Sequence, residues 1–592
     1  MKRYIILSLT AVAMLFVTSC EDVMDTKPYD KFDEATVWGS KATAEAFINS
    51  TYNSIVKGMY ASFVGIEAWT NNSVHGNGTS FTRELITRDD DFGFNQFQRI
   101  RTCNLIIEKV NESTVLNDNE KTALIAEGKF LRSMIYFWLA KRFGKVVWVD
   151  RVLGIEDPDF KLPTTPDVAT TYAKIIADID DAIAGLPAEA PTGRASKYAA
   201  AALKSEICLQ AAAYTGNSAY YQQAIDAADL VINSGKYEME TDYEGMFNEQ
   251  KPYSKEIILG VYTTKDVTNC DHVGELQNVV PNTNNDRVRA SGGSPYFNVD
   301  KIFEAWLWWS PSQNLVDNYL VIDQVTGQAI PWDESSQFLA SVNKTPGSGS
   351  VKEEGEVTDN SRVNELMYQN RDKRFYGTIV YDSCTWFNET VTLCVKGNLY
   401  RLVNGGLGPH VGVTNYYWRK GVYNVTPRVF YGIPTDYHWV IFRLGKVYLN
   451  KAEALLRQEK VLEAVNALNV TRTVHGDLPE STASTLSDAW ADYIRERRVD
   501  LAQEGDYYWS LLRWGKYGGD ANAGRLPGTK IAALEEAPAY VEISKNRKNY
   551  YIAKVTHSQN DVRVFDETRR YLLPIPQGQI NRNENLVQNP GW

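Results

Sequence analysis

Aromatic side chains suited to contact with a sugar gather in one stretch of the chain. The stretch holds Tyr296, Trp306, Trp308, Trp309 and Trp332. An indole offers a flat apolar face to the C–H surface of a sugar ring, and its N–H can still donate a hydrogen bond. Residues 300–309 read as a short helix that ends before Pro311, with Trp306 and Trp309 on one face. Trp308 then projects elsewhere, so at least one indole is hard to bury in a single core. The alternative, commoner for large aromatics, is that each ring belongs to the core.

Residues 69–78 are the expected source of polar contacts to the same ligand. They read Trp-Thr-Asn-Asn-Ser-Val-His-Gly-Asn-Gly, without an apolar period, which is typical of a loop. Trp69 adds a ring, and Asn71 and Asn72 carry amides that can bind hydroxyl groups. We therefore predict that the two stretches contribute to one binding site.

Motifs for catalysis are absent from the sequence. It contains no GxSxG, HExxH, GxxxxGK or GxGxxG pattern, and its six histidines are scattered singly. No Cys/His spacing suits zinc, and the acids Asp89 to Asp91 read as a solvated face rather than a calcium site. We predict no catalytic residue, no metal and no cofactor. A glycosidase with two carboxylates stays open as an alternative, because such a pair leaves no pattern in the sequence.

The first twenty residues predict export and lipidation. Lys2 and Arg3 precede an apolar run that is too short to span a bilayer, so residues 1–19 read as a signal peptide. Small residues before Cys20 form a lipobox-like site, which predicts a lipid anchor at Cys20 and a tether over residues 20–40. The alternative is an ordinary signal peptide with Cys20 as a stray thiol.

Two of the five remaining cysteines are spaced for a disulfide. Cys384 and Cys394 flank a stretch that can form a β-hairpin, and an exported protein meets oxidising conditions. We predict that these two thiols face each other. The alternative is that both remain free thiols.

Composition restricts the partners. The 592 residues are 44% hydrophobic and 23% charged, which suits a large folded body. The net charge is −11 and no dense basic run occurs, so nucleic acid is not an expected partner. No second apolar stretch is long enough to cross a membrane.

A long buried helix is expected near residues 118–143. Asn117 and Glu120 have capping-box spacing, and Gly144 supplies a stop. Apolar residues on more than one face indicate burial on several sides. Gly128 in its middle predicts the close approach of another helix.

Further helices are predicted at 41–60, 95–110, 172–186, 196–214 and 220–232. The last two form a pair that recurs 240 residues later without a gap. The matched residues are Ile207, Leu209, Ala212, Ala224, Ile225 and Ala227 with Val447, Leu449, Ala452, Ala464, Val465 and Ala467. Small residues recurring in paired helices are typical of tetratricopeptide-like repeats. Residues 261–434 instead read as an irregular, loop-rich insertion, and Ser341–Ser361 as a mobile segment because it is poor in apolar residues.

Several stretches resemble the SusD/RagB family. The matching residues are Ala126, Glu127, Phe130, Leu131, Arg132, Tyr136, Phe137, Phe143 and Gly144 in the long helix, then 370–375, Arg443, 449–454, 494–498, 504–505 and 512–515. Lys373 replaces a usual proline. The resemblance implies a lipid-anchored outer-membrane protein that captures nutrients, mostly glycans, for a partner SusC-like TonB-dependent transporter. It also implies four tetratricopeptide-like units split by an insertion.

The expected fold is mainly α: about four tetratricopeptide-like helix pairs with a large irregular insertion and short β-hairpins. Helical repeats are expected at 41–260 and 435–515, the ligand-binding insertion at 261–434, and a C-terminal capping segment at 516–592. The expected function is non-catalytic binding of an oligosaccharide at the exterior of the outer membrane. The alternatives are a helical-repeat interaction scaffold, since such repeats commonly bind protein segments, and a peptide-uptake receptor.

Overall fold

The computed structural model describes residues 34–61, 64–154, 157–266, 278–281, 306–401, 412–423, 436–515 and 532–592. Cys20, Cys270 and Tyr296 lie outside these residues. Within the described ranges, no helix is both long and apolar enough to cross a membrane.

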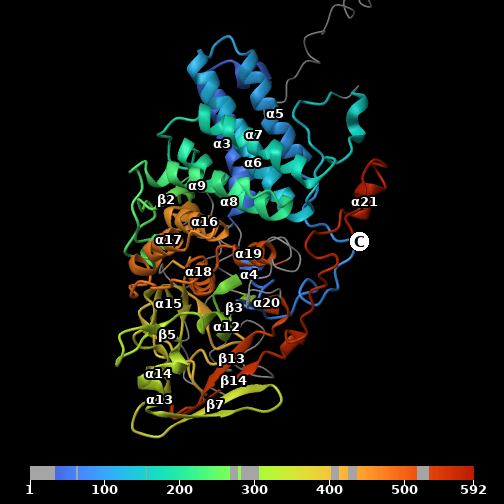
Figure 1. The fold of residues 1–592 in the computed structure, drawn as a ribbon. Helices are drawn as coiled ribbons and strands as arrows, with labels where there is room; N and C mark the ends of the chain where they lie inside the picture. The colour runs from blue at the N-terminus through green and yellow to red at the C-terminus, as the bar shows by residue number, and fades with distance from the viewer. Residues whose placement is uncertain are drawn as a thin grey trace, which may run out of the picture.

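Helices dominate the first part of the chain (Figure 1). They are α2 (Glu34–Trp38), α3 (Lys41–Tyr52), which continues as a π-helix (Asn53–Tyr60), α4 (Val64–Glu67), α5 (Phe97–Glu112), α6 (Asp118–Phe143), α7 (Val168–Gly185), α8 (Lys197–Thr215) and α9 (Ala219–Ile232). Short 3-10 turns lie at Pro158–Lys161 and Gly245–Phe247. The helices predicted for this region are therefore confirmed to within a few residues at each end.

Helix α6 is the buried centre of this region. The predicted capping box is present, because the Asn117 side chain accepts from the Glu120 N–H and the Glu120 carboxylate accepts from the Asn117 N–H. Gly144 ends the helix with a φ of 71°. A Cβ at Gly128 would lie 2.9 Å from Cγ1 of Ile107, so the glycine admits α5 as predicted.

The helical stack continues on both sides of the insertion, because two strands that are far apart in the sequence pair at the base of the insertion. β2 (Ile257–Thr263) pairs antiparallel with β12 (Tyr437–Arg443), so the chain leaves and re-enters the stack at one place. As a result α9 packs against α16 (Leu444–Arg457), which is followed by α17 (Val461–Val474), α18 (Leu486–Asp500) and α19 (Tyr507–Trp514).

The predicted internal repeat is visible in this stack. Helices α8 and α9 pack as a pair, and so do α16 and α17. All twelve matched positions, from Ile207 to Ala227 and from Val447 to Ala467, are buried. The fold is mainly helical with tetratricopeptide-like repeats, as expected.

The insertion forms the lower end of the molecule in Figure 1. Its strands are β3 (Trp309–Pro311), β4 (Val321–Ile322), β5 (Ala329–Ile330), β6 (Val342–Pro346), β7 (Val351–Val357), β8 (Ile379–Val380), β9 (Thr385–Trp386), β10 (Glu389–Thr390) and β11 (Tyr417–Trp418). Its helices are α12 (Gln313–Val316), α13 (Ser336–Leu339), α14 (Val363–Tyr368) and α15 (Lys373–Thr378), with a 3-10 turn at Trp332–Glu334.

The prediction that Ser341–Ser361 is mobile is wrong. Strands β6 and β7 in this segment form a hairpin within a four-stranded sheet, in the order β13–β14–β7–β6. β13 (Ala539–Ile543) and β14 (Asn549–Lys554) come from the C-terminal segment. Backbone hydrogen bonds supplied by that distant hairpin hold the segment, so it needs few apolar side chains of its own.

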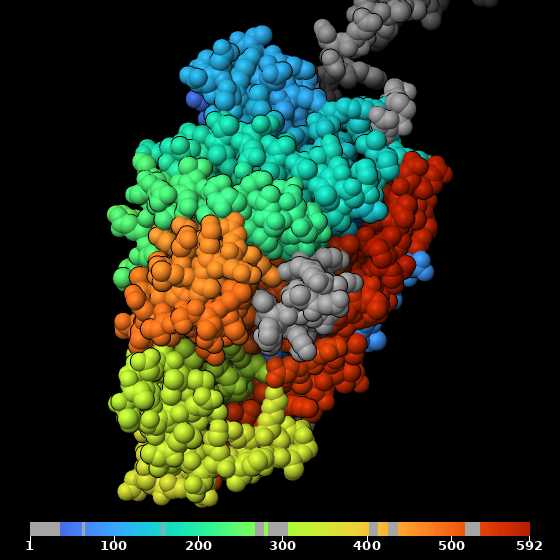
Figure 2. Space-filling model, in the orientation of Figure 1, coloured from blue at the N-terminus to red at the C-terminus, as the bar shows by residue number. Residues whose placement is uncertain are grey.

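The C-terminal segment covers one side of the stack. It begins with α20 (Ala532–Glu535), passes through the sheet, and ends after α21 (Gln577–Ile580). In Figure 2 it is the red band that runs from the insertion at the lower end up to the first helices. Near its end, the Asn589 amide donates to the carbonyl of Phe143 at the end of α6, at 3.1 Å.

Candidate functional site: an aromatic platform

A two-stranded ladder joins the two stretches that were predicted to form one site. β1 (Ser73–His75) pairs antiparallel with β3, with His75 opposite Trp309 and Ser73 opposite Pro311. The Gly76 N–H extends the ladder by donating to the carbonyl of Trp308, at 2.7 Å. The tertiary fold thus brings a loop near residue 75 against tryptophans more than 230 positions away in the sequence.

We define the aromatic platform as three tryptophans and one histidine on this ladder and in the residues just before β3: His75, Trp306, Trp308 and Trp309. Trp306 is 50% exposed and Trp308 is 37% exposed. The ring of His75 lies 5.3 Å from that of Trp308 and 5.6 Å from that of Trp309. Large aromatics that a fold leaves exposed are typical of interaction sites.

The helix predicted to end before Pro311 is wrong in the part that the structure describes. Residues 306–308 have no regular secondary structure, and Trp309 opens strand β3. The Leu307 side chain is buried while its two neighbours face outward, and its backbone lies at a φ of 34°. This alternation comes from an irregular backbone rather than from a strand, because a φ of 34° lies on the positive side that a leucine rarely adopts.

His75 is the residue of this site that sequence reasoning passed over. It is half-buried, and the loss of water around it lowers the pKa of its imidazole below the ordinary 6.5. The ring is therefore neutral at pH 7, and its Nδ1 accepts a hydrogen bond from the Asn77 N–H, at 3.1 Å. The exposed Asn77 side chain is the nearest loop amide in sequence. The sequence did contain a signal for this residue: the strand-like run Ser-Val-His interrupts a loop that is otherwise rich in turn-forming residues.

The amides of Asn71 and Asn72 point into the protein and are not placed to contact a ligand. Both are buried, and their oxygens accept hydrogen bonds from the Arg498 guanidinium, at 2.9 and 2.7 Å. Their amide groups donate to Glu536 and Glu67. This correction has a simple cause: a buried arginine needs acceptors, and this loop supplies them.

Two of the predicted tryptophans also lie away from the platform. Trp332 is buried, and its indole N–H donates to Asp317 at 2.9 Å. Trp69 is half-buried and stacks on Phe81 with ring centroids 3.9 Å apart. Both side chains therefore support the core, whereas Tyr296 lies outside the described residues.

Two family models together match most of the chain. The model of the SusD family matches residues 276–592, more than half of the sequence. The chain belongs to the SusD family. A second family model, described as starch-binding associating with outer membrane, matches residues 22–209.

Similar proteins cover nearly the full length. A SusD-like protein of Bacteroides ovatus is 21% identical over 86% of this chain and 82% of its own. The starch-binding protein SusD of Bacteroides thetaiotaomicron is 23% identical over 82% of this chain and 75% of its own. The crystal structure of a SusD-like protein from Bacteroides fragilis superposes with a TM-score of 0.72, covering 95% of this chain and 99% of its own at 24% identity.

Several residues of the SusD pattern meet in a buried charge network that looks like catalytic machinery. We define the buried charge network as Glu256, Asp372, Arg374, Lys420, Arg443, His475, Glu496, Asp500 and Glu504, all buried or nearly so. His475 lies between two carboxylates, with Nδ1 2.7 Å from Asp500 and Nε2 2.8 Å from Glu256. Carboxylates only accept, so both ring nitrogens donate and the ring is cationic.

The network is structural. Burial alone would lower the pKa of His475, but the charges of Glu256 and Asp500 outweigh it and raise the pKa to about 9. Arg374, from the insertion, binds Asp372, Glu496 and Asp500, while Arg443 binds Asp500 at 2.6 Å. These ion pairs therefore fasten the insertion to α18.

The predicted disulfide is not formed. Cys384 and Cys394 are both free and buried, although the predicted hairpin is present as β9 and β10. The ladder places Val391 opposite Cys384, with the Val391 N–H donating to the Cys384 carbonyl at 2.8 Å. Cys394 lies three residues beyond that partner. Burial raises the pKa of both thiols.

Proposed function

We propose that this protein is a non-catalytic receptor that binds a glycan at the cell surface and delivers it to a partner TonB-dependent outer-membrane transporter. The observation that carries the proposal is that the indoles of Trp306 and Trp308 are exposed on a SusD-family fold, with Trp308 packed against His75. Exposed aromatic faces suit sugar rings, and amide or imidazole groups beside them suit hydroxyls. The match to a family described as starch-binding and the similarity to the starch-binding protein SusD support the same ligand class.

Binding to neutral oligosaccharides tests the ligand class. Maltoheptaose, laminarihexaose and a wider panel of neutral glycans would be titrated by calorimetry against the wild type and Trp306→Ala/Trp308→Ala. Each stacked ring contributes about 0.5–1.5 kcal/mol beyond its buried area, so we expect the double variant to bind at least roughly tenfold more weakly.

Phe160→Ala is the matched control, because Phe160 is an equally exposed aromatic that lies outside the platform. It should bind like the wild type. A folded double variant with unchanged affinity would place the ligand site elsewhere, and peptide binding in place of sugar binding would favour the peptide-uptake alternative.

Anchoring of the receptor through Cys20 is part of the proposal. Labelling cells with a palmitate analogue should mark the wild type and leave Cys20→Ala unmarked. Equal labelling of both proteins would contradict a lipid anchor at this residue.

We assign docking of the transporter to the helical repeats, residues 41–260 and 435–515, which we call the helical half. Stacked repeats present a continuous surface. A tag on this protein should recover the transporter from mild detergent. Recovery of the tagged protein alone, with the transporter expressed, would contradict the assignment.

A further inference from the structure

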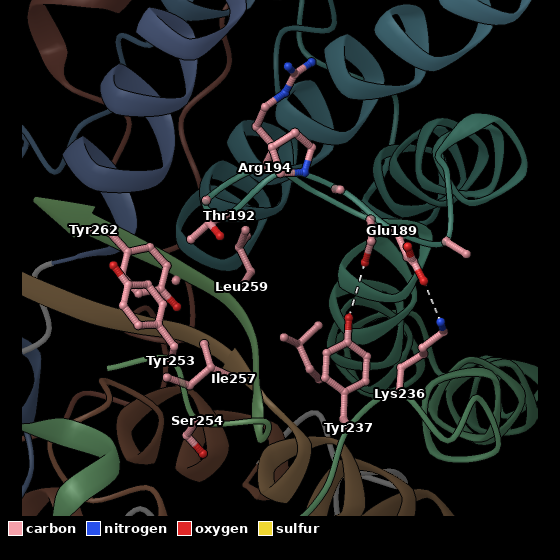
Figure 3. Close-up of a pocket in the computed structure, with 17 residues that line it drawn as sticks. Glu189, Thr192, Arg194, Lys236, Tyr237, Tyr253, Ser254, Ile257, Leu259 and Tyr262 are labelled. Atoms are coloured by element: carbon pink, nitrogen blue, oxygen red, sulfur yellow. Dashed lines mark hydrogen bonds and ion pairs between the residues drawn. The ribbon is translucent and has the colours of Figure 1, made fainter. Parts of the chain in front are cut away.

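A cavity of about 440 Å³ opens beside strand β2, on elements that the aromatic platform does not use. The connection between α7 and α8 at residues 188–194 forms one wall, and Lys236 and Tyr237, which follow α9, form another. Figure 3 shows Tyr253 and Tyr262 along the opposite side, with Ile257 and Leu259 of β2 between the walls. The volume falls within the range of about 300–1,000 Å³ that is usual for small-molecule sites.

An exposed pair of stacked tyrosines borders this cavity. The rings of Tyr253 and Tyr262 lie 5.0 Å apart and within 17° of parallel. Tyr253 is 68% exposed although one of its faces is covered by Tyr262, so its other face is open to solvent. The Tyr262 ring lies across Gly260, where a Cβ would come within 2.8 Å of it. The glycine is therefore needed for the stack.

The polar groups around the cavity favour a neutral ligand. Lys236 and Glu189 pair with each other at 2.7 Å on the rim. Arg194 forms ion pairs with Glu127 and Glu45. Among the described residues, the hydroxyls of Tyr253 and Tyr262 have no hydrogen-bond partner. The walls thus offer hydroxyl groups and one open aromatic face, and no unpaired charge or deep apolar hole of the kind that anchors a peptide.

We propose that this cavity, the tyrosine pocket, is a second carbohydrate site that binds a short segment of a neutral oligosaccharide by stacking a sugar ring on Tyr253. The proposal rests on the proposed function, since it assumes the same ligand class. The proposal goes further because it places a second sugar contact beside β2, apart from the aromatic platform. The receptor could then hold one long glycan at two points, or two separate glycans.

The experiment removes the platform first. In the Trp306→Ala/Trp308→Ala background, residual binding of the neutral glycan panel would be measured by saturation-transfer NMR. Adding Tyr253→Ala should weaken this residual binding roughly three- to tenfold, whereas adding Tyr253→Phe should retain it because the ring is kept. Tyr253 is exposed, so both substitutions should leave the circular dichroism spectrum unchanged.

The outcomes separate the two proposals. Residual binding that Tyr253→Ala removes and Tyr253→Phe keeps supports the tyrosine pocket. If the wild type binds sugar but the platform variant binds none, or if Tyr253→Ala changes nothing, the tyrosine pocket is overturned while the proposed function stands. A wild type that binds no glycan of the panel overturns both.

Discussion

Two histidines lie in opposite surroundings, and the contrast separates structure from function in this protein. His475 lies in the buried charge network, where Glu256 and Asp500 hold both ring nitrogens. His75 lies in the aromatic platform, where its ring meets two tryptophans and its backbone pairs with β3. In the first region every charge has a partner and only Glu504 reaches solvent, at 10% exposure, whereas the second region exposes large aromatic faces. Residue types that resemble catalytic machinery therefore hold the fold together, while exposed aromatic side chains form the surface that we propose as the binding site.

Removing a cation from the buried charge network should have the largest effect. Arg374→Met leaves Asp372, Glu496 and Asp500 without their shared partner, and such a loss costs about 3–5 kcal/mol. We expect that loss in the free energy of unfolding measured with urea. The neighbouring Lys373→Met is the control: its ion pair with Asp477 is 63% and 65% exposed, so its effect should stay within about 1 kcal/mol. Equal effects would contradict the structural role of the network.

The pH dependence of stability tests whether His475 is charged in the folded protein. The pKa of His475 is about 9 in the folded protein and about 6.5 unfolded, so the folded state holds its proton more tightly. Its contribution is complete below pH 6.5, declines between pH 6.5 and 9, and is lost above pH 9, with a total of about 3 kcal/mol.

His475→Gln should be less stable than the wild type at pH 6, and the two should converge towards pH 9. The measurement is the urea midpoint at half-unit steps of pH. If the difference between the two proteins is the same at pH 6 and pH 9, His475 is not charged in the folded state.

A smaller effect is expected at the platform histidine. His75→Ala removes ring contacts with Trp308 and Trp309 worth about 0.5–1.5 kcal/mol, so stability should fall by no more than that, while the loss of support for the platform should lower glycan affinity roughly two- to tenfold. Because the pKa of His75 is lowered from its ordinary 6.5, wild-type affinity should be nearly constant from pH 7.5 to 8.5. Calorimetry across this range checks both statements, and an affinity that changes within it would mean that a charged His75 takes part.

The smallest effect is expected at the cysteines. Cys384 and Cys394 are free, so a reducing agent should leave the melting temperature unchanged. Thiol titration of the denatured, never-reduced protein should detect both. A Cys384→Ser variant that loses a reducible cross-link would show that the two thiols are joined in the secreted protein.

The sequence alone was sufficient for features that depend on neighbours a few residues apart. The bounds of α6 follow from Asn117, Glu120 and Gly144, and the register of the repeat follows from small and apolar residues at helical spacing. Helix capping and apolar periodicity depend only on residues close in the sequence, so both can be recognised without knowledge of the fold. The grouping of the 69–78 loop with the tryptophans was also anticipated, from residue chemistry.

Only the tertiary structure decided which members of those stretches reach the surface. The side chains of Asn71 and Asn72 accept hydrogen bonds from Arg498, which is more than 420 positions away. Trp332 is buried against Phe338 and Asp317. Strand β7 is ordered by β14, which lies about 200 residues later. Burial and strand pairing depend on which distant segments meet, and a local pattern carries no information about that choice.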